Sequence, residues 1–155
     1  IHRQENTDDI AKLKNIFEGL TRIHASKKVV LPLHPRTKKV LEENGLSYPI
    51  ETMPPVGYFD MLELLKNCQM VLTDSGGLQK EAYCNQRHCV IVREETEWVE
   101  LVRHGFAEIV GSDSDSMCQS FESFQKSSAD FSMNLYGNEV GESIYKALLN
   151  LITQD

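Results

Sequence analysis

The stretch from Gln69 to Tyr83 constrains the fold more than any other part of this chain. A short apolar run, Met70–Leu72, leads into a polar corner that contains Gly76 and Gly77, and the residues after it follow a helical pattern. This order predicts a strand, a tight turn and the N-terminus of a helix. The first N–H groups of a helix lack intrahelical partners and carry partial positive charge, so glycines there leave room for a phosphate or diphosphate. An ordinary strand-to-helix turn explains the same residues equally well.

Short apolar runs alternate with helix-forming segments along the whole chain. The sequence predicts strands at 28–33, 47–52, 70–73, 88–92 and 107–111. It predicts helices at 7–25, 35–44, 58–67, 78–85, 97–104, 112–126 and about 140–153. Asn6 or Thr7 is expected to cap the first helix, with Asp8 and Asp9 in its first turn. The alternation predicts an α/β domain whose parallel strands form one open sheet covered by helices on both faces. No repeat, low-complexity tract or linker divides residues 1–155.

Charge and hydropathy exclude several classes of partner. The formal net charge of −7 argues against nucleic acid, because phosphate backbones select basic surfaces. No apolar run approaches the roughly 20 residues that a membrane-spanning helix needs, and no secretion signal opens the chain. Ile1 is not a natural start, so we expect the sequence to be a piece of a longer protein. Four cysteines without metal-type spacing are expected to be buried, reduced thiols of a cytoplasmic protein: Cys68, Cys84, Cys89 and Cys118.

Polar clusters open the chain or follow predicted strands. They are His2-Arg3, His34-Pro35, Thr73–Gly77 and Arg93–Glu97. Ligands of parallel α/β sheets bind beyond the carboxyl ends of the strands, so we expect these clusters on one rim. His2 and Arg3 could bond a sugar hydroxyl or neutralise a phosphate, or could be a surface pair at a frayed terminus. His34 could equally serve a ligand or cap neighbouring backbone groups.

Further candidate ligand groups surround the glycine corner. Asp74 and Ser75 can both take part in hydrogen bonds at the start of the corner, and Ser75 could bond a phosphate oxygen directly. Glu81 lies one helical turn beyond Gly77 and, since a carboxylate repels a diphosphate, is better suited to ribose hydroxyls; a solvated glutamate is the alternative. Arg93 ends a buried strand, so phosphate binding competes there with an ion pair to nearby glutamates. The chain has no Gly-x-Ser-x-Gly elbow, no P-loop or dinucleotide glycine spacing, and no histidine pair for a metal.

Neighbouring residues are expected to have structural roles only. Glu5 and Asn6 are predicted to face solvent as helix caps. Thr96 is predicted to cap the helix that follows it, and Trp98 to pack in the core. Lys80 is predicted to be a solvated helix residue.

Together these motifs resemble those of the non-hydrolysing UDP-N-acetylglucosamine 2-epimerases. The matching segments, in the family's order, are His2-Arg-Gln-Glu-Asn6, Pro32-Leu-His-Pro35, Thr73-Asp-Ser-Gly-Gly-Leu-Gln-Lys-Glu-Ala82, Arg93-Glu-Glu-Thr-Glu97 and Asn134-Leu-Tyr-Gly137. The resemblance implies a GT-B fold with two Rossmann-like halves, of which residues 1–155 form the C-terminal, UDP-binding half without the N-terminal domain. It also implies a homodimer when full-length, a role in polysaccharide synthesis, and the use of neither metal nor NAD.

The resemblance also implies a mechanism and a set of site residues. Such enzymes invert C2 of the sugar by eliminating UDP to a 2-acetamidoglucal and adding it back after reprotonation on the other face, which needs acid/base carboxylates and donors for the departing diphosphate. His2 is the implied catalytic residue here, and Arg3 and His34 resemble contacts to a second, activating UDP-N-acetylglucosamine. The carboxylates belong to the absent half, so the fragment alone is expected to be inactive. The implied UDP contacts are Ser75, Gly76, Gly77, Glu81 and Arg93.

Two positions depart from the family pattern. The usual Thr-Glu-Arg-Pro-Glu reads Thr96-Glu-Trp-Val-Glu100, and Lys80 replaces a common glutamate. These departures keep the epimerase class but leave the sugar open, so that a UDP-2,3-diacetamido sugar or a hydrolysing outcome are alternatives. The nucleotide-binding half of a GT-B glycosyltransferase and a non-catalytic nucleotide-binding module also remain alternatives.

Overall fold

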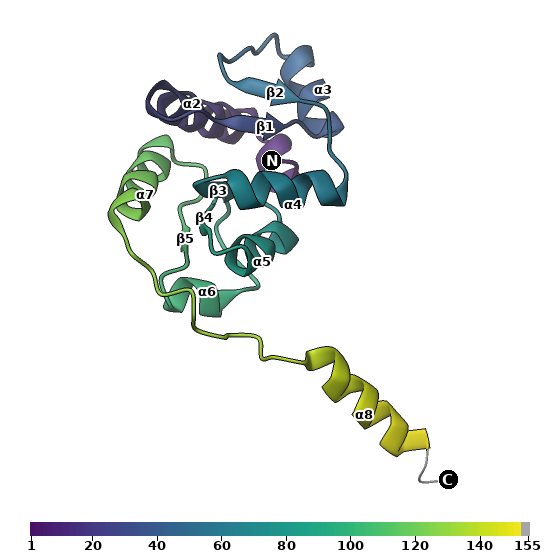
Figure 1. Cartoon of the computed structure of the whole chain (residues 1–155). Helices are drawn as coiled ribbons and strands as arrows, with labels where there is room; N and C mark the ends of the chain where they lie inside the picture. Colours follow the sequence, from purple (N-terminus) through teal and green to yellow (C-terminus); the bar gives the residue numbers. More distant parts are fainter. Residues whose placement is uncertain (153–155) are drawn as a thin grey trace.

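The computed structural model, which describes residues 1–152, forms strands and helices in the predicted order (Figure 1). The strands are β1 (Val30–Pro32), β2 (Glu51–Met53), β3 (Met70–Thr73), β4 (His88–Ile91) and β5 (Ala107–Ile109). The helices are α1 (Gln4–Thr7), α2 (Ile10–Ser26), α3 (Pro35–Glu43), α4 (Tyr58–Asn67), α5 (Gly76–Cys84), α6 (Val99–Arg103), α7 (Ser114–Lys126) and α8 (Val140–Ile152). Apart from α1, the apolar runs and the glycine stops therefore predicted the element order correctly.

The strands pair in parallel, but in two separate groups within residues 1–152. β1 pairs with β2, with Leu31 opposite Thr52. β3, β4 and β5 form a second sheet in that order, with Val71 opposite Cys89 and Cys89 opposite Ala107. The predicted parallel pairing is confirmed, whereas the prediction of one continuous sheet is wrong for the residues described, since β1 and β3 are not hydrogen-bonded neighbours.

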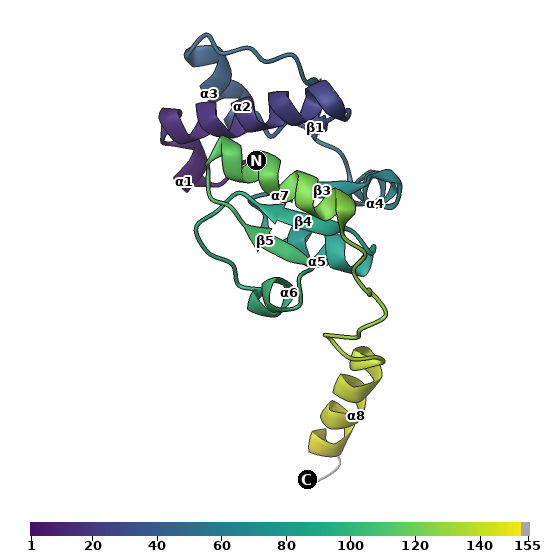
Figure 2. The same cartoon turned by 90° about the vertical axis from the view of Figure 1, so that its left-hand side faces the viewer.

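Helices cover both faces of the larger sheet. α5 packs on β3 and β4, and α7 packs on β4 from the opposite face (Figure 2). The central strand β4 is consequently buried along its whole length. This three-layer arrangement is the one expected for parallel strands, whose side chains are apolar on both faces.

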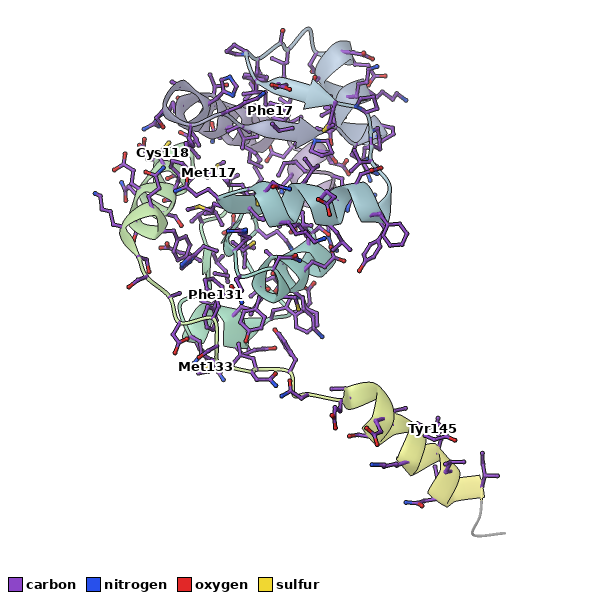
Figure 3. The ribbon with its side chains drawn as sticks, in the orientation of Figure 1. Phe17, Met117, Cys118, Phe131, Met133 and Tyr145 are labelled. Carbon is purple, nitrogen blue, oxygen red and sulfur yellow. The ribbon has the colours of Figure 1, made fainter. Side chains whose placement is uncertain are left out.

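The close packing of α2 on α7 depends on a glycine. A Cβ atom added at Gly19 would lie 2.8 Å from Sδ of Met117 and 3.3 Å from the backbone Cα of Ser114. Met117 and Phe17 are both fully buried in the core between these helices (Figure 3). Glycine inside a helix costs roughly 1 kcal/mol relative to alanine, and the close contact between α2 and α7 offsets this cost.

The start of the chain differs from prediction. A short helix, α1, precedes α2, and the side chain of Asp9 caps α2 by accepting hydrogen bonds from the N–H groups of Ala11 and Lys12. Asn6 and Thr7 are each only 2% exposed. The predicted cap at Asn6 or Thr7 is therefore wrong, because both residues pack into the domain.

The last helix, α8, extends away from the domain (Figure 1). It is amphipathic as predicted, but its apolar side chains, such as Ile144, Tyr145 and Leu148, are more than half exposed. Tyr145 lies well apart from the core residues labelled in Figure 3. The predicted final helix ran to residue 153, which lies outside the described residues. No helix in residues 1–152 has the length and apolar content needed to cross a bilayer.

Candidate functional site

The N-terminus of α5 is open in the way the glycine corner predicted. Ser75 occupies the capping position, but its side chain makes no capping hydrogen bond within the described structure. Its N–H donates to Oγ1 of Thr73 at 3.0 Å, which ties the corner to the end of β3. The first helical hydrogen bond runs from the Gln79 N–H to the Ser75 carbonyl at 3.3 Å. The N–H groups between them have no carbonyl one turn earlier in the helix and are suited to an anion.

The two glycines of the corner have different surroundings. A Cβ atom at Gly77 would meet nothing within 4 Å, so the helix start is open to approach on that side. A Cβ atom at Gly76 would lie 3.0 Å from Oε2 of Glu97 and 3.8 Å from Nη2 of Arg3. Gly77 therefore leaves room for a ligand, whereas Gly76 leaves room for neighbouring charged side chains.

A cavity of about 800 Å³ joins the corner to the predicted rim residues. Ser75, Gly77 and Glu81 line it on the α5 side, and His2 and His34 line it from the start of the chain and of α3. Five residues predicted from three separate motifs thus face one space. Glu81 projects into the same cavity one turn along α5, as its spacing predicted.

Asp74 holds the start of the chain against the corner. Its side chain is fully buried, and its Oδ2 accepts from the N–H groups of His2 and Arg3, both at 2.8 Å, and from Nδ2 of Asn6 at 3.3 Å. Burial acts to raise the pKa of Asp74, but the amino group of Ile1, the two N–H donors and the His2 ring together lower it below its ordinary value. Asp74 is thus a buried carboxylate whose charge is satisfied mainly by main-chain donors.

His2 lies between a carboxylate and a second histidine. Its Nδ1 is 3.2 Å from Oδ1 of Asp74, and its ring centroid is 5.2 Å from that of His34. Burial lowers the pKa of His2 and outweighs Asp74, which acts in the opposite direction. The ring thus turns Nδ1 towards Asp74, and a proton on Nδ1 would leave Nε2 to exchange a proton with a ligand.

His34 caps α3. Its Nδ1 accepts a hydrogen bond from the N–H of Arg36 at 3.2 Å. The capping role that the sequence offered for His34 is therefore present in the fold. It does not exclude ligand binding, because the cap uses only Nδ1 and the ring also lines the cavity beside His2.

Arg93 makes internal ion pairs. The guanidinium is 7% exposed; its Nε donates to Oε1 of Glu5 at 2.9 Å and its Nη1 to both carboxylate oxygens of Glu97 at 2.9–3.0 Å. Burial acts to lower the pKa of Arg93, but the two carboxylates raise it above its ordinary value. Glu5 faces solvent as predicted, with its side chain 39% exposed, but it is also an ion-pair partner, which the sequence did not indicate.

Arg93 also borders a second, smaller cavity. This space of about 370 Å³ adjoins the arginine cluster at the start of the chain. Its lining residues are His2, Arg3, Gln4, Glu5, Arg36 and Arg93. His2 lines both cavities, and Arg93 is connected to the glycine corner through Glu97, whose Oε2 lies against Gly76.

Trp98 and Lys80 support the corner from outside the cavity. The indole Nε1 of Trp98 donates to the Gly76 carbonyl at 2.7 Å. Nζ of Lys80 lies 4.8 Å from the Trp98 ring centroid and 4.3 Å from that of Tyr136, which are cation–π distances. The prediction of a merely solvated Lys80 is wrong, and Trp98 is more than a core residue.

Thr96 does not cap a helix directly. The helix α6 begins only at Val99. Oγ1 of Thr96 instead accepts a hydrogen bond from the Trp98 N–H at 3.0 Å and donates one to Oε1 of the buried Gln79. The threonine therefore links the turn before α6 to α5. Within residues 1–152, no three His, Cys, Asp or Glu side chains form a cluster that could hold a metal ion.

Sequence reasoning missed two residues that organise the site. Asp74 was named only as a possible hydrogen-bonding group, and Asn6 only as a cap, yet Asn6 donates to the Val92 carbonyl at 2.9 Å as well as to Asp74. Their partners lie about 70 or more residues away along the chain, so no local pattern indicates these contacts. Of the four cysteines, all unpaired, Cys89 is buried but Cys84 is exposed, so the predicted burial is wrong for Cys84.

A parallel α/β domain with an open helix N-terminus beside charged rim residues is typical of proteins that bind a phosphorylated ligand. Comparison with known proteins gives the family: residues 1–149 match the model of the UDP-N-acetylglucosamine 2-epimerase family, and the chain belongs to it. The fold is confirmed as α/β and Rossmann-like, the C-terminal half of a GT-B architecture. That residues 1–155 form a UDP-binding domain whose N-terminal partner lies upstream stays a prediction.

Individual relatives are longer than this chain. A UDP-2,3-diacetamido-2,3-dideoxy-D-glucuronate 2-epimerase of Pseudomonas aeruginosa is 48% identical over 77% of the chain and 34% of its own length. The UDP-N-acetylglucosamine 2-epimerase of Methanocaldococcus jannaschii is 36% identical over 96% of the chain and 43% of its own length. Its crystal structure in complex with UDP-GlcNAc and UDP superimposes with a TM-score of 0.88 over 96% of this chain and 43% of that one. The chain thus spans less than half of these relatives.

Proposed function

We propose that the intact protein is a sugar-nucleotide 2-epimerase that interconverts UDP-N-acetylglucosamine and UDP-N-acetylmannosamine by eliminating UDP and adding it back. The chain described here contributes the UDP-binding half. The observation that carries the proposal is the uncapped N-terminus of α5, which opens at Gly77 into the cavity shared with His2 and Glu81. The related protein solved in complex with UDP-GlcNAc and UDP supports the same ligand class.

In this proposal the diphosphate lies at the start of α5. Gly76 and Gly77 contribute backbone N–H groups and Ser75 contributes its hydroxyl, since the Ser75 N–H already donates to Thr73. The helix dipole stabilises the negative charge that grows as UDP departs. Glu81, one turn further on, accepts hydrogen bonds from the ribose hydroxyls. These fixed donors favour the transition state because they need no rearrangement when the bond to the sugar breaks.

His2 is the proposed catalytic residue of this half. Asp74 orients the ring through Nδ1, so that Nε2 can exchange a proton with the departing or returning diphosphate. Arg93 is proposed to support UDP binding indirectly. Its Nη1 donates to Glu97, and Oε2 of Glu97 lies against Gly76 at the start of α5. The carboxylates that remove and return the C2 proton come from the absent half of the enzyme.

The remaining roles depend on the intact protein. Arg3 and His34 are proposed to contact a second nucleotide sugar that activates the enzyme. The enzyme is further proposed to be a cytoplasmic homodimer that serves polysaccharide synthesis and uses neither metal nor NAD. A missing N-terminal domain is consistent with the length of the relatives, of which the chain covers 34–44%.

A second substrate is favoured by one comparison. The 48% identity to a UDP-2,3-diacetamido-2,3-dideoxy-D-glucuronate 2-epimerase exceeds the 36–37% identity to the archaeal UDP-N-acetylglucosamine enzymes. The alternative proposal is therefore that the intact protein epimerises a UDP-2,3-diacetamido uronic acid. Incubating the intact protein with each substrate and following the C2 configuration by NMR distinguishes the two.

The main test uses the intact protein with UDP-N-acetylglucosamine in deuterated water and no acceptor. We expect the manno isomer to appear with deuterium at C2, because the C2 proton is lost and replaced. Calorimetry with UDP should show weaker binding for a Ser75→Ala/Glu81→Ala double variant than for the exposed control Glu63→Ala. Equal UDP affinity in the wild type, the double variant and the control would refute the assigned site. Turnover only with an added acceptor would indicate a glycosyltransferase.

A further inference from the structure

One side of α5 carries a lysine whose ammonium group lies between two aromatic rings. Nζ of Lys80 is 4.8 Å from the ring centroid of Trp98 and 4.3 Å from that of Tyr136. The two rings meet edge to face, with their centroids 5.6 Å apart and their planes at 84°. A cation within about 6 Å of a ring centroid is attracted to the face of that ring, so both rings attract this ammonium group.

The three side chains come from separate parts of the chain. Lys80 lies on the second turn of α5, Trp98 directly precedes α6, and Tyr136 lies between α7 and α8. Lys80 is only partly buried, and holding its long side chain in one place costs rotamer entropy, which the attraction to two rings offsets. We call Lys80, Trp98 and Tyr136 together the lysine clamp.

The segment that carries Tyr136 is itself attached to α5. Tyr83 lies three residues after Lys80, on the same side of the helix. Its hydroxyl donates to the Met133 carbonyl and accepts from the Leu135 N–H at 3.3 Å. Its ring also meets that of Tyr136 edge to face, with the centroids 5.6 Å apart. The Tyr136 ring is therefore held in place beside Lys80.

Trp98 connects the clamp to the start of α5. Its indole Nε1 donates to the Gly76 carbonyl at 2.7 Å. That carbonyl belongs to the same planar peptide unit as the N–H of Gly77, so the direction of the carbonyl fixes the direction of the N–H. The Gly77 N–H is one of the groups that have no partner one turn earlier in the helix. A hydrogen bond to the carbonyl also polarises the peptide, which makes its N–H a stronger donor.

The clamp lies outside the cavity that the start of α5 borders. Gly77 lines this cavity of about 800 Å³, whereas neither Lys80 nor Trp98 is among the described residues that line it. An effect of Lys80 on a ligand in the cavity would therefore pass through Trp98 and the peptide between Gly76 and Gly77.

We propose that Lys80 is a positioning residue for the anion-binding start of α5. It holds the indole of Trp98 in the orientation that fixes the peptide between Gly76 and Gly77, and so keeps the Gly77 N–H directed at the diphosphate. The inference deepens the proposed function and rests on it, because it requires the diphosphate of UDP to lie at this end of α5. Lys80 is not a catalytic residue, since its ammonium group does not touch the ligand.

The first arm of the test measures UDP binding to the intact protein by calorimetry. Lys80→Ala keeps a good helix former but removes the cation, and we expect about threefold weaker binding. Lys80→Arg should restore nearly the wild-type affinity, because a guanidinium group also binds aromatic faces. In a Trp98→Phe protein, which lacks the indole donor, Lys80→Ala should cause no further loss. The control Lys39→Ala removes a lysine of α3 that is 74% exposed, and should bind UDP like the wild type.

The second arm uses the intact protein without nucleotide. Acrylamide quenching of Trp98 is obtained as the difference in emission between each protein and its Trp98→Phe variant. Lys80→Ala uncovers one face of the indole, so the quenching constant should rise, and Lys80→Arg should lower it again. This arm tests the clamp itself, wherever UDP binds.

The two arms separate failure of the clamp from failure of the UDP site. Unchanged quenching in Lys80→Ala would overturn the proposal, as would an equal loss of UDP affinity with and without the indole, because the ammonium group would then act as a distant charge. Unchanged UDP affinity in Lys80→Ala, while Ser75→Ala/Glu81→Ala still weakens binding, would overturn it and leave the assigned UDP site intact. If Ser75→Ala/Glu81→Ala also binds UDP unchanged, the placement of UDP fails, and the proposal fails with it.

Discussion

Replacing Asp74 by asparagine tests whether the buried carboxylate organises the start of the chain. The substitution keeps the shape and one acceptor oxygen but removes the charge that two N–H groups at 2.8 Å and the His2 ring share. Hydrogen bonds to charged groups contribute about 1.5–3 kcal/mol each, and part of this remains with the neutral acceptor, so we expect a loss of about 3 kcal/mol in the free energy of unfolding.

Urea titration followed by circular dichroism measures this loss at pH 7. The pH dependence gives an independent readout, because the folded pKa of Asp74 lies below its ordinary value of 3.8. The contribution of the Asp74 carboxylate to the free energy of unfolding is then present above the unfolded pKa and is lost as the pH falls through the folded pKa. Asp74→Asn should remove this pH-dependent part of the stability. The exposed Asp130, which accepts from the Ser132 N–H, gives the control Asp130→Asn. Equal stability of Asp74→Asn and the wild type would refute the reasoning.

Three further predictions concern packing, titration and the corner. Gly19→Ala should destabilise the domain by about 1–3 kcal/mol in urea titration, because the new methyl overlaps Met117, whereas Gly141→Ala in α8, where a Cβ meets nothing within 4 Å, should not. Burial lowers the pKa of His88, so the neutral ring contributes fully to the free energy of unfolding above about pH 6.5. This contribution should decline as the pH falls towards the folded pKa, and His88→Phe should flatten this part of the profile of stability against pH. Trp98→Phe should weaken UDP binding of the intact protein about fivefold in calorimetry, since it removes the donor to the Gly76 carbonyl.

Each of these has an outcome that contradicts it. A Gly19→Ala protein as stable as Gly141→Ala would mean that α2 and α7 separate without cost. A pH profile unchanged by His88→Phe would mean that the pKa of the ring, which stacks on Phe124 at 4.4 Å, is the same in the folded and unfolded states. UDP affinity unaffected by Trp98→Phe would show that the Gly76 peptide is held without the indole.

The local features of the fold were predictable from the sequence. Apolar runs bounded by glycine, and helices with an apolar face, specify their own structure over 5 to 15 residues, as the segments 58–67 and 70–73 show. The open end of α5 followed from Gly76 and Gly77 in the same way. Such signals depend only on residues that are close together in the chain, so a single sequence is enough to detect them.

Contacts between distant segments were not predictable. Glu5 pairs with Arg93, and Asn6 bonds Asp74 and Val92, although the sequence assigned both residues to solvent. The side chain of Asp9 replaced theirs as the cap of α2, because any of several polar residues near a helix start can fill that position. The separation of the two sheets was likewise missed, since alternating elements indicate parallel pairing but not which strands are neighbours.

Different parts of the structure form the proposed ligand site and position His2. The glycine corner belongs to β3 and α5, which β4 supports along its length. His2 belongs to the chain start, which reaches the corner mainly through Asp74 and the contacts of Ile1 and Asn6. Loss of the contacts around Ile1 should therefore displace His2 while the end of α5 stays in place. UDP affinity and support for turnover should then respond to different variants, the first to Ser75 and the second to Asp74.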